Sequence, residues 1–562
     1  MFKQIARDKN FWNKVRNDES YKPMVQRLFE LYNEYCTSED IPSVKFSEYK
    51  LYFETGDRYI YEKPYFFKRK RMNTLAILCL IYPENNEYLE KLQDTIWAIC
   101  DEYSWVLPAH AKAYPHTEYT TIDLFSAETA FALAEIKFLL EHKLSHIIKN
   151  RIDDEINKKV LSVFKTNEQF WEKCTHNWAA VCAASVGAAF MYQSPNEFKS
   201  VMSRINSAMD FFLSGYPNDG ACLEGISYWE YGFGFYIWYA ELLKDFTNGS
   251  EDLFKNEKLL NIADFAQKTY LTPNTTISFS DANSQTKIMV GISHFLKSVY
   301  GEKVSLVPHI STKTDDHCGR WCHHIRSFVF FNPQYTNEEF QNSAQYYFDN
   351  AQWYIKRTPS YSFAVKGGNN NEPHNHNDIG SFIIAKGQRQ ILADLGCGEY
   401  TKEYFRPQTR YGILCNSSFG HSVPVINGKA QCAGEEYQGK LTLHNNIVTI
   451  NMKNAYNEPT LKKLERKIET TKSSIKLTDS FEFEGDGSYA CRLVSCIKPE
   501  LCNNNIVLDS AHIEYNNTLW EASVITKEHT LHVSGGGIKV YLIDLKPLKK
   551  SDSIELNIRI LE

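Results

Sequence analysis

The sequence predicts a protein of the α-then-β class, in which a large all-helical domain precedes an antiparallel β domain. From residue 20 to about residue 300, apolar residues recur three and four positions apart, which is typical of amphipathic helices. After about residue 325 the apolar runs become short and alternate with polar residues, which is typical of half-buried strands. The length of 562 residues also indicates more than one domain.

The first part is expected to hold at least nine helices, joined by short turns of Pro, Asn, Asp and Gly. Some segments, such as VCAASVGAAFMY, are apolar on more than one face, which predicts an inner layer of helices buried by an outer layer. The segments with helical spacing are residues 24–36, 72–82, 87–103, 122–144, 154–164, 170–192, 198–216, 228–246 and 259–271.

The second part is expected to form layered antiparallel sheets, because Gly, Asn, Asp and Pro separate its short runs. We place the boundary in SLVPHISTKTDDHCGR, which gives a helical domain over residues 1–310 and a β domain over residues 320–562. The strand-like runs are residues 327–331, 352–357, 361–368, 380–387, 390–396, 440–453, 473–485, 489–499, 538–546 and 554–561.

Composition and charge narrow the classes of function. The content of 43% apolar and 23% charged residues is that of a soluble globular protein, and the 14% aromatic content suits surfaces that bind sugars. A net charge of −6 and the lack of a nucleic-acid motif argue against a nucleic-acid partner. The dense basic run Lys68–Arg71 is expected to be a solvated start of a helix; the alternative is a site for carboxylates or sulfates.

The expected location is the cytoplasm. The first residues show no apolar signal segment, and no window of the chain approaches 18 uncharged apolar residues, so no membrane partner is expected. The fourteen cysteines are scattered without a disulfide framework, which fits reduced thiols.

The most informative motif is NEPHNHNDIGSF, residues 371–382. If it enters a strand, the side chains of His374, His376 and Asp378 point to one face. The two imidazoles could bind a metal jointly, or one could bind the metal while the other transfers protons. Asp394 and His421, both next to apolar strand-like runs, are candidates for further metal ligands.

A second histidine-rich motif, HCGRWCHH, covers residues 317–324. Its cysteines and histidines are closely spaced, as in metal sites, but no second ligand pair follows at zinc-finger spacing. We therefore favour a structural role for this motif.

Two polar motifs stand out in the helical part. THNWAAV places His176 and Asn177 in a helix of small apolar residues, where a buried amide must find a hydrogen-bond partner. The aromatic-rich turn YPNDGACLEGISYWEYG offers polar and aromatic side chains near a helix start; these are Asp219, Glu224, Tyr228, Trp229 and Tyr231.

Taken together, HNWAAVCAASVG, DGACLEGISYWEYG, HNHNDIGSF, ILADLGCGEY and NSSFGHSVPVINGK resemble, in that order, motifs of the heparinase II/III-like polysaccharide lyases. The resemblance covers most of the chain. It implies an incomplete (α/α) toroid followed by an antiparallel β-sandwich. It also implies cleavage of uronic-acid glycans by β-elimination.

The resemblance assigns a role to each matching residue. Asn177 matches the residue that binds the uronate carboxylate, Tyr228 the general acid, and His374 the base or its partner. A metal triad is implied by His376, Asp394 and His421; the ion is commonly zinc, with manganese or another divalent ion as alternatives, and its role is structural. Further substrate contacts are expected from His176, Trp178, Glu224, Trp229, Arg410 and Tyr411.

The sequence departs from the family at one position. Several relatives have a histidine after the asparagine of the helical motif, whereas here Asn177 is followed by Trp178 and the histidine, His176, comes before it. His176 lies about 100° around a helix from Asn177, so the substitution is not equivalent. Tyr411 is the candidate for a second catalytic tyrosine, which some alginate-cleaving members use.

The expected function is a lyase that acts on a glycosaminoglycan such as heparan sulfate, chondroitin sulfate or hyaluronan. The alternatives are an alginate or oligoalginate lyase of the same fold, a glycoside hydrolase that uses Asp219 and Glu224 as its acid/base pair, and a binding protein without catalysis, which Trp178 favours. The expected partner is an anionic oligo- or polysaccharide, and a homodimer is left open.

Overall fold

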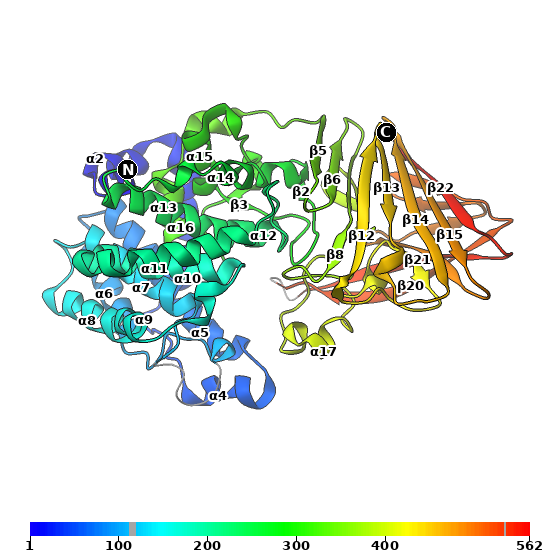
Figure 1. Cartoon of the computed structure of the whole chain (residues 1–562). Helices are drawn as coiled ribbons and strands as arrows, with labels where there is room; N and C mark the ends of the chain where they lie inside the picture. Colours follow the sequence, from blue (N-terminus) through cyan, green and yellow to red (C-terminus); the bar gives the residue numbers. More distant parts are fainter. Residues whose placement is uncertain (112–119, 533–535, 562) are drawn as a thin grey trace. The chain divides into compact units, whose positions relative to one another are not determined.

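A computed structural model describes residues 1–111, 120–532 and 536–561 (Figure 1). The chain forms two compact units, each assembled from separate segments. The helical unit comprises Met1–Tyr216, Trp229–Leu260 and Ile288–Asn337. The β unit comprises Pro217–Tyr228, Asn261–Lys287 and Glu338–Glu562. The predicted order, helices followed by antiparallel sheets, is confirmed.

The helical unit contains most of the α-helices of the chain. They are α1 (Phe2–Ala6), α2 (Lys9–Asn17), α3 (Lys22–Tyr35), α4 (Phe46–Thr55), α5 (Tyr59–Ile81), α6 (Asn86–Cys100), α7 (Leu124–Leu139), α8 (His146–Ile156), α9 (Ser162–Thr166), α10 (Asn177–Gln193), α11 (Pro195–Ser214), α13 (Gly234–Phe246), α15 (Val290–Tyr300) and α16 (Trp321–Val329). A short parallel pair, β3 (Ile288–Met289) and β4 (Thr312–Lys313), also belongs to it, and α14 (Glu257–Ala263) crosses from this unit into the next.

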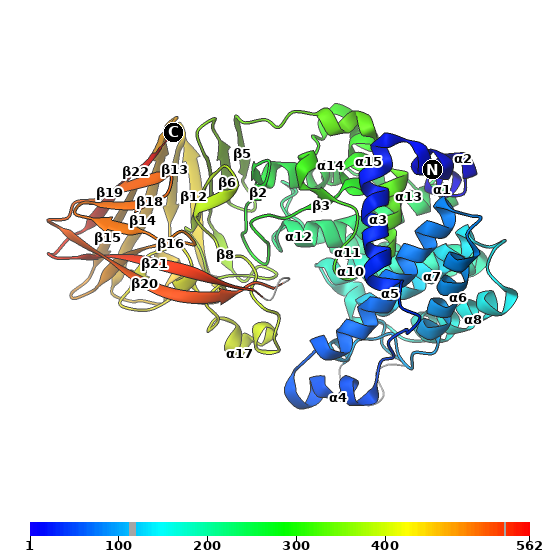
Figure 2. The ribbon, with the colours of Figure 1, turned by 180° about the vertical axis from the view of Figure 1, so that it is seen from behind.

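Helix α10 lies at the centre of the helical unit, where it packs against α7, α11 and α13 (Figure 1). Nearly all of its residues are buried, as the apolar run predicted. A Cβ atom on Gly187 would lie 2.7 Å from the ring of Tyr239, so only glycine allows this close approach of α10 and α13. Figure 2 shows α3 and α5 side by side on another face of the unit. The predicted inner and outer layers of helices are therefore present.

Lys68, Arg69 and Arg71 of the basic run are buried in α5, and Lys70 is half-buried, so the prediction of a solvated helix start was wrong. Both guanidinium η-nitrogens of Arg69 donate to Glu102, at 2.6 and 2.7 Å, and the Lys68 ammonium lies 2.6 Å from the same carboxylate. Arg71 donates to backbone carbonyl oxygens. These cations neutralise a buried acid and satisfy backbone acceptors inside the unit, which a charge count along the sequence does not reveal.

Residues 327–331, predicted as a strand, largely belong to helix α16. A short apolar run is compatible with a buried helix as well as with a strand, because the two differ only in the residues around it. The helix is fixed by Arg326, whose guanidinium donates two hydrogen bonds to Glu135 of α7, at 2.8 and 2.9 Å. Both side chains are fully buried.

The β unit contains three larger antiparallel sheets. Their orders are β10-β9-β7-β6-β5, β11-β16-β21-β20, and β17-β18-β19-β22-β15-β14-β13-β12-β8. The strands are β5 (Ala344–Phe348), β6 (Trp353–Arg357), β7 (Ser362–Lys366), β8 (Gly368–Asn370), β9 (Phe382–Lys386), β10 (Arg389–Leu392), β11 (Val425–Ile426), β12 (Gly434–His444), β13 (Ile447–Asn451), β14 (Leu461–Thr470), β15 (Ser474–Phe483), β16 (Tyr489–Ser495), β17 (Glu500–Cys502), β18 (Asn505–Leu508), β19 (Ala511–Glu514), β20 (Trp520–Thr530), β21 (Gly537–Pro547) and β22 (Ser553–Ile560).

The core of the β unit follows from the alternation of its strands. Along β22, buried residues alternate strictly with exposed ones, so one face of the large sheet is apolar. That face packs against residues of the other two sheets, and Phe363, Leu477 and Ile543, one from each sheet, are fully buried in one cluster. Figure 1 shows β12 to β15 as adjacent long strands, and Figure 2 shows the β20–β21 pair.

Two segments from the helical part of the sequence belong to the β unit, which differs from the division at residues 310 and 320 expected from the sequence. They include α12 (Ile226–Tyr228) and a hairpin of β1 (Tyr270–Thr272) and β2 (Thr275–Thr276). Arg357 of β6 donates to the carbonyl oxygen of Tyr270 at 2.6 Å. Ser278 donates to the carbonyl oxygen of Asp394 at 2.9 Å. Both contacts join the segment that carries Asp281 to the unit with the histidine motif, and the other segment, Pro217–Tyr228, carries Tyr228.

A helix that spans a lipid bilayer must be both long and apolar. Within the described ranges, no helix combines the length and the apolar character that a membrane span requires.

Candidate active site

The histidine motif is a loop between β8 and β9, so the expected strand geometry for residues 374–378 was wrong. His374 has a φ of 57°, a left-handed conformation that breaks strand alternation. The guanidinium of Arg410 donates to the carbonyl oxygen of Asn375 at 2.9 Å. The backbone N–H of Asn377 donates to the carbonyl oxygen of Asn416 at 2.9 Å. Both hydrogen bonds fix the backbone of the loop, so its side chains are held in place without a ladder of strand pairs.

The carboxylate of Asp281 brings the two histidines of the motif together. Its Oδ2 atom lies 2.5 Å from Nδ1 of His374, and its Oδ1 atom lies 3.0 Å from Nε2 of His376. The hydroxyl of Tyr404 also donates to Oδ1, and the guanidinium of Arg410 lies 3.6 Å from it. Burial alone would raise the pKa of Asp281, but these donors hold it well below its usual range. A buried carboxylate therefore orients both imidazoles.

Tyr228 lies directly against His374. The two rings are stacked with centroids 4.1 Å apart, and the hydroxyl of Tyr228 is 2.9 Å from the hydroxyl of Tyr400. Burial, and then the negative charge of Asp281, raise the pKa of Tyr228 well above its usual value, so this hydroxyl keeps its proton at neutral pH. Glu224 approaches the other ring nitrogen of His374, with Oε2 3.6 Å from Nε2. The cluster thus joins a protonated phenol to an oriented imidazole.

A second buried cluster lies beside the first. Asp378, Asp394 and His421 each offer one ligand atom, and these atoms lie within 4.8 Å of one another. Nδ1 of His421 is 3.1 Å from Oδ2 of Asp394. Burial alone would lower the pKa of His421, but the charge of Asp394 raises it overall. Oδ1 of Asp378 is paired with the Lys366 ammonium at 2.8 Å, whereas Oδ2 has no hydrogen-bond partner among the described residues.

His376 lies between the two clusters. Its Nε2 atom faces Asp281, whereas its Nδ1 atom is buried and has no hydrogen-bond partner in the described ranges. Its ring centroid is 5.4 Å from that of His421. Burial lowers the pKa of His376, which favours the neutral imidazole that metals bind. Carboxylates and imidazoles with unsatisfied atoms are a donor set that suits a divalent cation such as zinc, so these residues fit the predicted metal with Asp378 as an added ligand.

A known family model matches the part of the chain that carries the histidine motif and the potential metal ligands. Residues 341–540 match the family model of the heparinase II/III-like C-terminal domain. The resemblance predicted from the motifs is confirmed. No curated protein matches the sequence.

Solved structures extend the similarity to the helical part. The chain is similar to heparinase III (13% identity, TM-score 0.64, covering 98% of this chain and 91% of that one). It is also similar to heparan sulfate lyase HepC from Pedobacter heparinus, with 13% identity and a TM-score of 0.60 over 100% of this chain and 87% of that one. A third similar structure is the chondroitin AC lyase of Streptomyces coelicolor, with 8% identity and a TM-score of 0.58 over 100% of this chain and 82% of that one. The predicted fold, an incomplete (α/α) toroid followed by an antiparallel β-sandwich, is confirmed.

Two of the predicted residues of the β unit have contacts that differ from expectation. Arg410 was expected to bind substrate, but it is buried and donates to the carbonyl oxygens of Asn375 and Tyr404. It therefore positions the histidine loop. Tyr411 is half-buried at the end of α17 (Pro407–Arg410). The tyrosine that meets Tyr228 is Tyr400, not Tyr411.

The predicted residues of the helical unit start helix α10. His176 is its N-cap, Asn177 its first residue, and Trp178 follows half-buried, whereas the sequence suggested that Asn177 lies within a helix. Asn177 itself is buried. Trp229 was expected to touch substrate, but only 1% of its surface is exposed and it packs against Phe233.

The HCGRWCHH motif leads into α16: its last four residues, 321–324, form the first turn and are buried, whereas His317 is exposed. His323 accepts a hydrogen bond from Nε1 of Trp238 at 2.8 Å, which is a structural role. In the part of the chain that the structure describes, the clustered potential metal ligands are Asp378, Asp394 and His421, and this motif is not among them.

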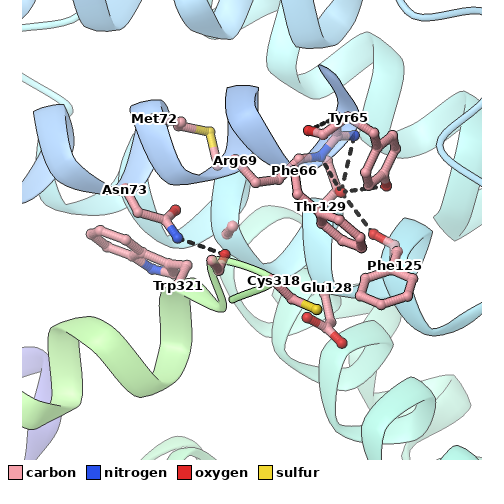
Figure 3. A pocket seen from close by; sticks show the side chains of 12 residues that line it. Tyr65, Phe66, Arg69, Met72, Asn73, Phe125, Glu128, Thr129, Cys318 and Trp321 are labelled. Atoms are coloured by element: carbon pink, nitrogen blue, oxygen red, sulfur yellow. Dashed lines mark hydrogen bonds between the residues drawn. The ribbon is translucent and has the colours of Figure 1, made fainter. Parts of the chain in front are cut away.

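The helical unit also contains a small pocket between α5, α7 and the start of α16 (Figure 3). Asn73 donates to the carbonyl oxygen of Gly319 at its rim, and Arg69 lies near the hydroxyl of Thr129. Burial raises the pKa of Glu128, in the pocket wall, to about 7. The lining residues are Tyr65, Phe66, Arg69, Met72, Asn73, Phe125, Glu128, Thr129, Ala132, Cys318, Gly319 and Trp321.

Sequence reasoning missed four residues of the site: Asp281, Asp378 as a ligand, Tyr400 and Tyr404. Asp281 stands in SFSDANS, a short polar stretch without periodicity or a motif. Tyr400 and Tyr404 follow ILADLGCG in GEYTKEYF, whose density of tyrosines was the one available signal. Asp378 was expected on the same strand face as His374 and His376, but it was not predicted as a metal ligand.

Proposed function

We propose that the protein is a polysaccharide lyase that cleaves uronic-acid-containing glycans by β-elimination. The observation that carries the proposal is the imidazole of His374, held by Asp281 and stacked on Tyr228. The family match and the lyases among the similar structures support the same class of enzyme. HepC is named a heparan sulfate lyase and the Streptomyces enzyme a chondroitin AC lyase, so both names point to anionic polysaccharides.

The reaction requires a base and an acid. The base removes the proton at C5 of the uronate, the electron pair forms the C4–C5 double bond, and the bond from C4 to the leaving oxygen breaks. His374 suits the first role: Asp281 binds Nδ1, which leaves Nε2 as the ring nitrogen that can accept the proton. Tyr228 suits the second, because its raised pKa leaves it a proton to give to the leaving oxygen.

The C5 proton is too weakly acidic to be removed unless the neighbouring carboxylate is neutralised. Asn177, at the start of α10, is proposed to donate its amide to that carboxylate, where negative charge develops in the transition state. Glu224, which approaches Nε2 of His374, would stabilise the imidazolium that forms once the proton has been taken up.

We propose a glycosaminoglycan as the substrate, and alginate as the second candidate. The alternative is supported by Tyr400, whose hydroxyl meets that of Tyr228, because the resemblance associates a late second tyrosine with alginate cleavage. The hydrolase alternative gains no such support. The carboxylate of Asp219 accepts hydrogen bonds from the backbone N–H groups of Asn350 (2.8 Å), Ala351 (3.0 Å) and Ala221 (3.2 Å), which is a structural use.

We further propose that one divalent ion, with zinc preferred, is bound by Asp394 and His421 together with Asp378 and Nδ1 of His376. When bound, the ion supplies positive charge that satisfies these buried atoms. Its role is structural: His376 also contacts Asp281, so fixing His376 fixes the carboxylate that orients His374.

The test is an ultraviolet assay against heparan sulfate, chondroitin sulfates, hyaluronan and alginate. Elimination gives a C4–C5 double bond that absorbs in the near ultraviolet, whereas hydrolysis gives reducing ends without this absorbance. We expect absorbance to rise with at least one polymer or its oligosaccharides. The variants His374→Ala and Tyr228→Phe should remove the rise, and the exposed controls His444→Ala and Tyr347→Phe should keep it. Cleavage that survives in both site variants would overturn the assignment.

A further inference from the structure

We infer that His110, in the helical unit, is an additional substrate-binding residue that donates a hydrogen bond to the carboxylate of a uronate ring. The inference rests on the proposed function, because it takes the ligand to be a uronate glycan. It concerns the helical unit alone, and the observations that support it are an oriented imidazole and the aromatic rings around it.

The imidazole of His110 is oriented by a buried acid. Its Nδ1 atom lies 2.8 Å from Oδ2 of Asp123, whose side chain is fully buried, whereas 12% of the His110 side chain is exposed. Asp123 is itself fixed, because it caps helix α7 by accepting from the N–H of Ser126 at 2.8 Å and also accepts from the N–H of Leu107 at 3.1 Å. With Nδ1 bound to Asp123, Nε2 is the atom left to meet a ligand.

His110 stands in a partly exposed aromatic patch, which we define as His110, Phe125, Trp178 and Phe170. Its ring stacks on Phe125 with centroids 5.7 Å apart and meets the edge of Trp178 at 4.9 Å. Trp178 in turn contacts Phe170 at 5.1 Å, and 44% of Phe170 is exposed. Phe125 also lines the pocket of Figure 3. Aromatic faces of this kind pack against the apolar face of a sugar ring.

The position of Trp178 connects the patch with carboxylate recognition. It directly follows Asn177, the residue proposed to bind the uronate carboxylate, in the first turn of α10. An imidazolium against the Trp178 ring can donate Nε2–H to a substrate carboxylate while Asp123 stabilises the positive charge from the other side. Position 178 of the helical motif is a tryptophan, and the imidazole of His110 packs against the ring of this tryptophan.

His323 illustrates the purely structural alternative in the same unit. Only 1% of it is exposed, and Nδ1 accepts a hydrogen bond from Trp238. Burial lowers its pKa to about 3, so it stays neutral. His110 differs in both contacts and exposure: it is partly exposed, and its Nδ1 atom faces the carboxylate of Asp123 rather than a hydrogen-bond donor.

The test uses the full chain and the variants His110→Ala and His110→Gln, with the exposed His142→Ala as the matched control. Glutamine keeps an N–H donor but carries no charge, so it also covers the case in which the alanine variant does not fold. On the best substrate of the ultraviolet assay, kcat/KM should fall about 10- to 100-fold in both variants, the effect of losing one charge-assisted hydrogen bond. His142→Ala should match the unaltered protein. Values for both His110 variants equal to the control would overturn the inference.

A binding measurement separates this inference from the proposed function. The imidazole proton signals of His110, assigned by their loss in His110→Gln, are followed by NMR during titration with uronate-containing oligosaccharides of defined size. A shift of these signals supports the inference, and unchanged signals contradict it. If the unaltered protein cleaves none of the polymers, the proposed function fails, and the titration alone then decides the role of His110.

Discussion

Two fully buried carboxylates, Glu135 in the helical unit and Asp378 in the β unit, differ in how completely their oxygens are paired with donors. Glu135 accepts four hydrogen bonds: two from Arg326, one from the hydroxyl of Tyr192 and one from Nε1 of Trp321, all between 2.7 and 2.9 Å. Oδ1 of Asp378 is paired with the Lys366 ammonium at 2.8 Å, whereas Oδ2 has no hydrogen-bond partner among the described residues.

The difference distinguishes a buried carboxylate that only stabilises the fold from one that can bind a further group. A satisfied buried carboxylate holds helices together and has no capacity left for a ligand. A carboxylate with one open oxygen, as in Asp378 beside Asp394 and His421, is costly to bury unless a further group binds there. The oriented pair of His374 and Tyr228 lies beside this second kind of cluster. The comparison predicts that mutations in the two units harm different properties.

The largest expected effect is on activity in the β unit. His374→Ala removes the proposed base and should lower kcat by about 10²- to 10⁴-fold. Its side chain is partly exposed, so the midpoint of urea unfolding should change little. Both quantities are measured on the same preparation, with His444→Ala as the control. A variant that unfolds more easily but keeps its kcat would show that His374 is structural.

The next effect is on stability in the helical unit. Glu135→Ala leaves the Arg326 guanidinium buried without its partner, and the free energy of unfolding should fall by about 3–5 kcal/mol. Urea unfolding followed by circular dichroism measures it. Glu141→Ala, at a side chain that is 54% exposed, should change it by less than about 0.5 kcal/mol. Equal values for the two variants would remove the distinction between the clusters.

The next prediction concerns metal binding in the β unit. Elemental analysis should find one zinc or other divalent ion per chain, and the ion should stabilise the protein by about 2.7 kcal/mol when its free concentration is 100 times the Kd. Asp394→Asn and His421→Ala should abolish both effects, whereas the exposed Asp349→Asn should keep them. Unaltered protein that binds no divalent ion under these conditions would contradict the proposed site.

The smallest expected effect is a loss of stability of the helical unit at acidic pH. Burial lowers the pKa of His294 to about 4, and its Nδ1 atom accepts a hydrogen bond from the N–H of Asn332 at 3.0 Å. In the unfolded chain the pKa is near 6.5. Between these values only the unfolded state takes up the proton, so the stabilisation is complete above pH 6.5 and is lost as the pH falls toward 4.

At pH 5 this loss amounts to about 2 kcal/mol relative to pH 8. It is measured as the difference in the free energy of unfolding between the two pH values. The variant His294→Asn should reduce that difference by the same amount. An unchanged difference would mean that His294 is not buried in its neutral form.

The sequence predicted the parts of this account that depend on local pattern. Helical and strand periodicity separates the two kinds of structure, because one face of each element is buried. Motifs identified His374, Tyr228 and Asn177, since each stands within a run of characteristic residues. The short apolar run at residues 327–331 was misassigned, because its helix depends on the distant contact between Arg326 and Glu135.

The rest depends on tertiary contacts that leave no local signal. Asp281 is 93 residues from His374 along the chain, and only the folding of the segment Asn261–Lys287 into the β unit joins them. The left-handed backbone of His374 cannot be read from a histidine between a proline and an asparagine. For the same reason Tyr400 was missed: its hydroxyl meets Tyr228 across 172 positions of sequence.

The most direct test of the central claim is the mass of the products formed from a size-defined uronate oligosaccharide in ¹⁸O-labelled water. β-Elimination adds no water, so the account predicts an unsaturated fragment and a fragment with a new hydroxyl whose masses sum to that of the substrate, with no ¹⁸O incorporated at the cleavage site. His374→Ala should form neither fragment. Products that together are heavier than the substrate by one labelled water would show hydrolysis and would contradict the assignment of Tyr228 and His374 as a lyase pair.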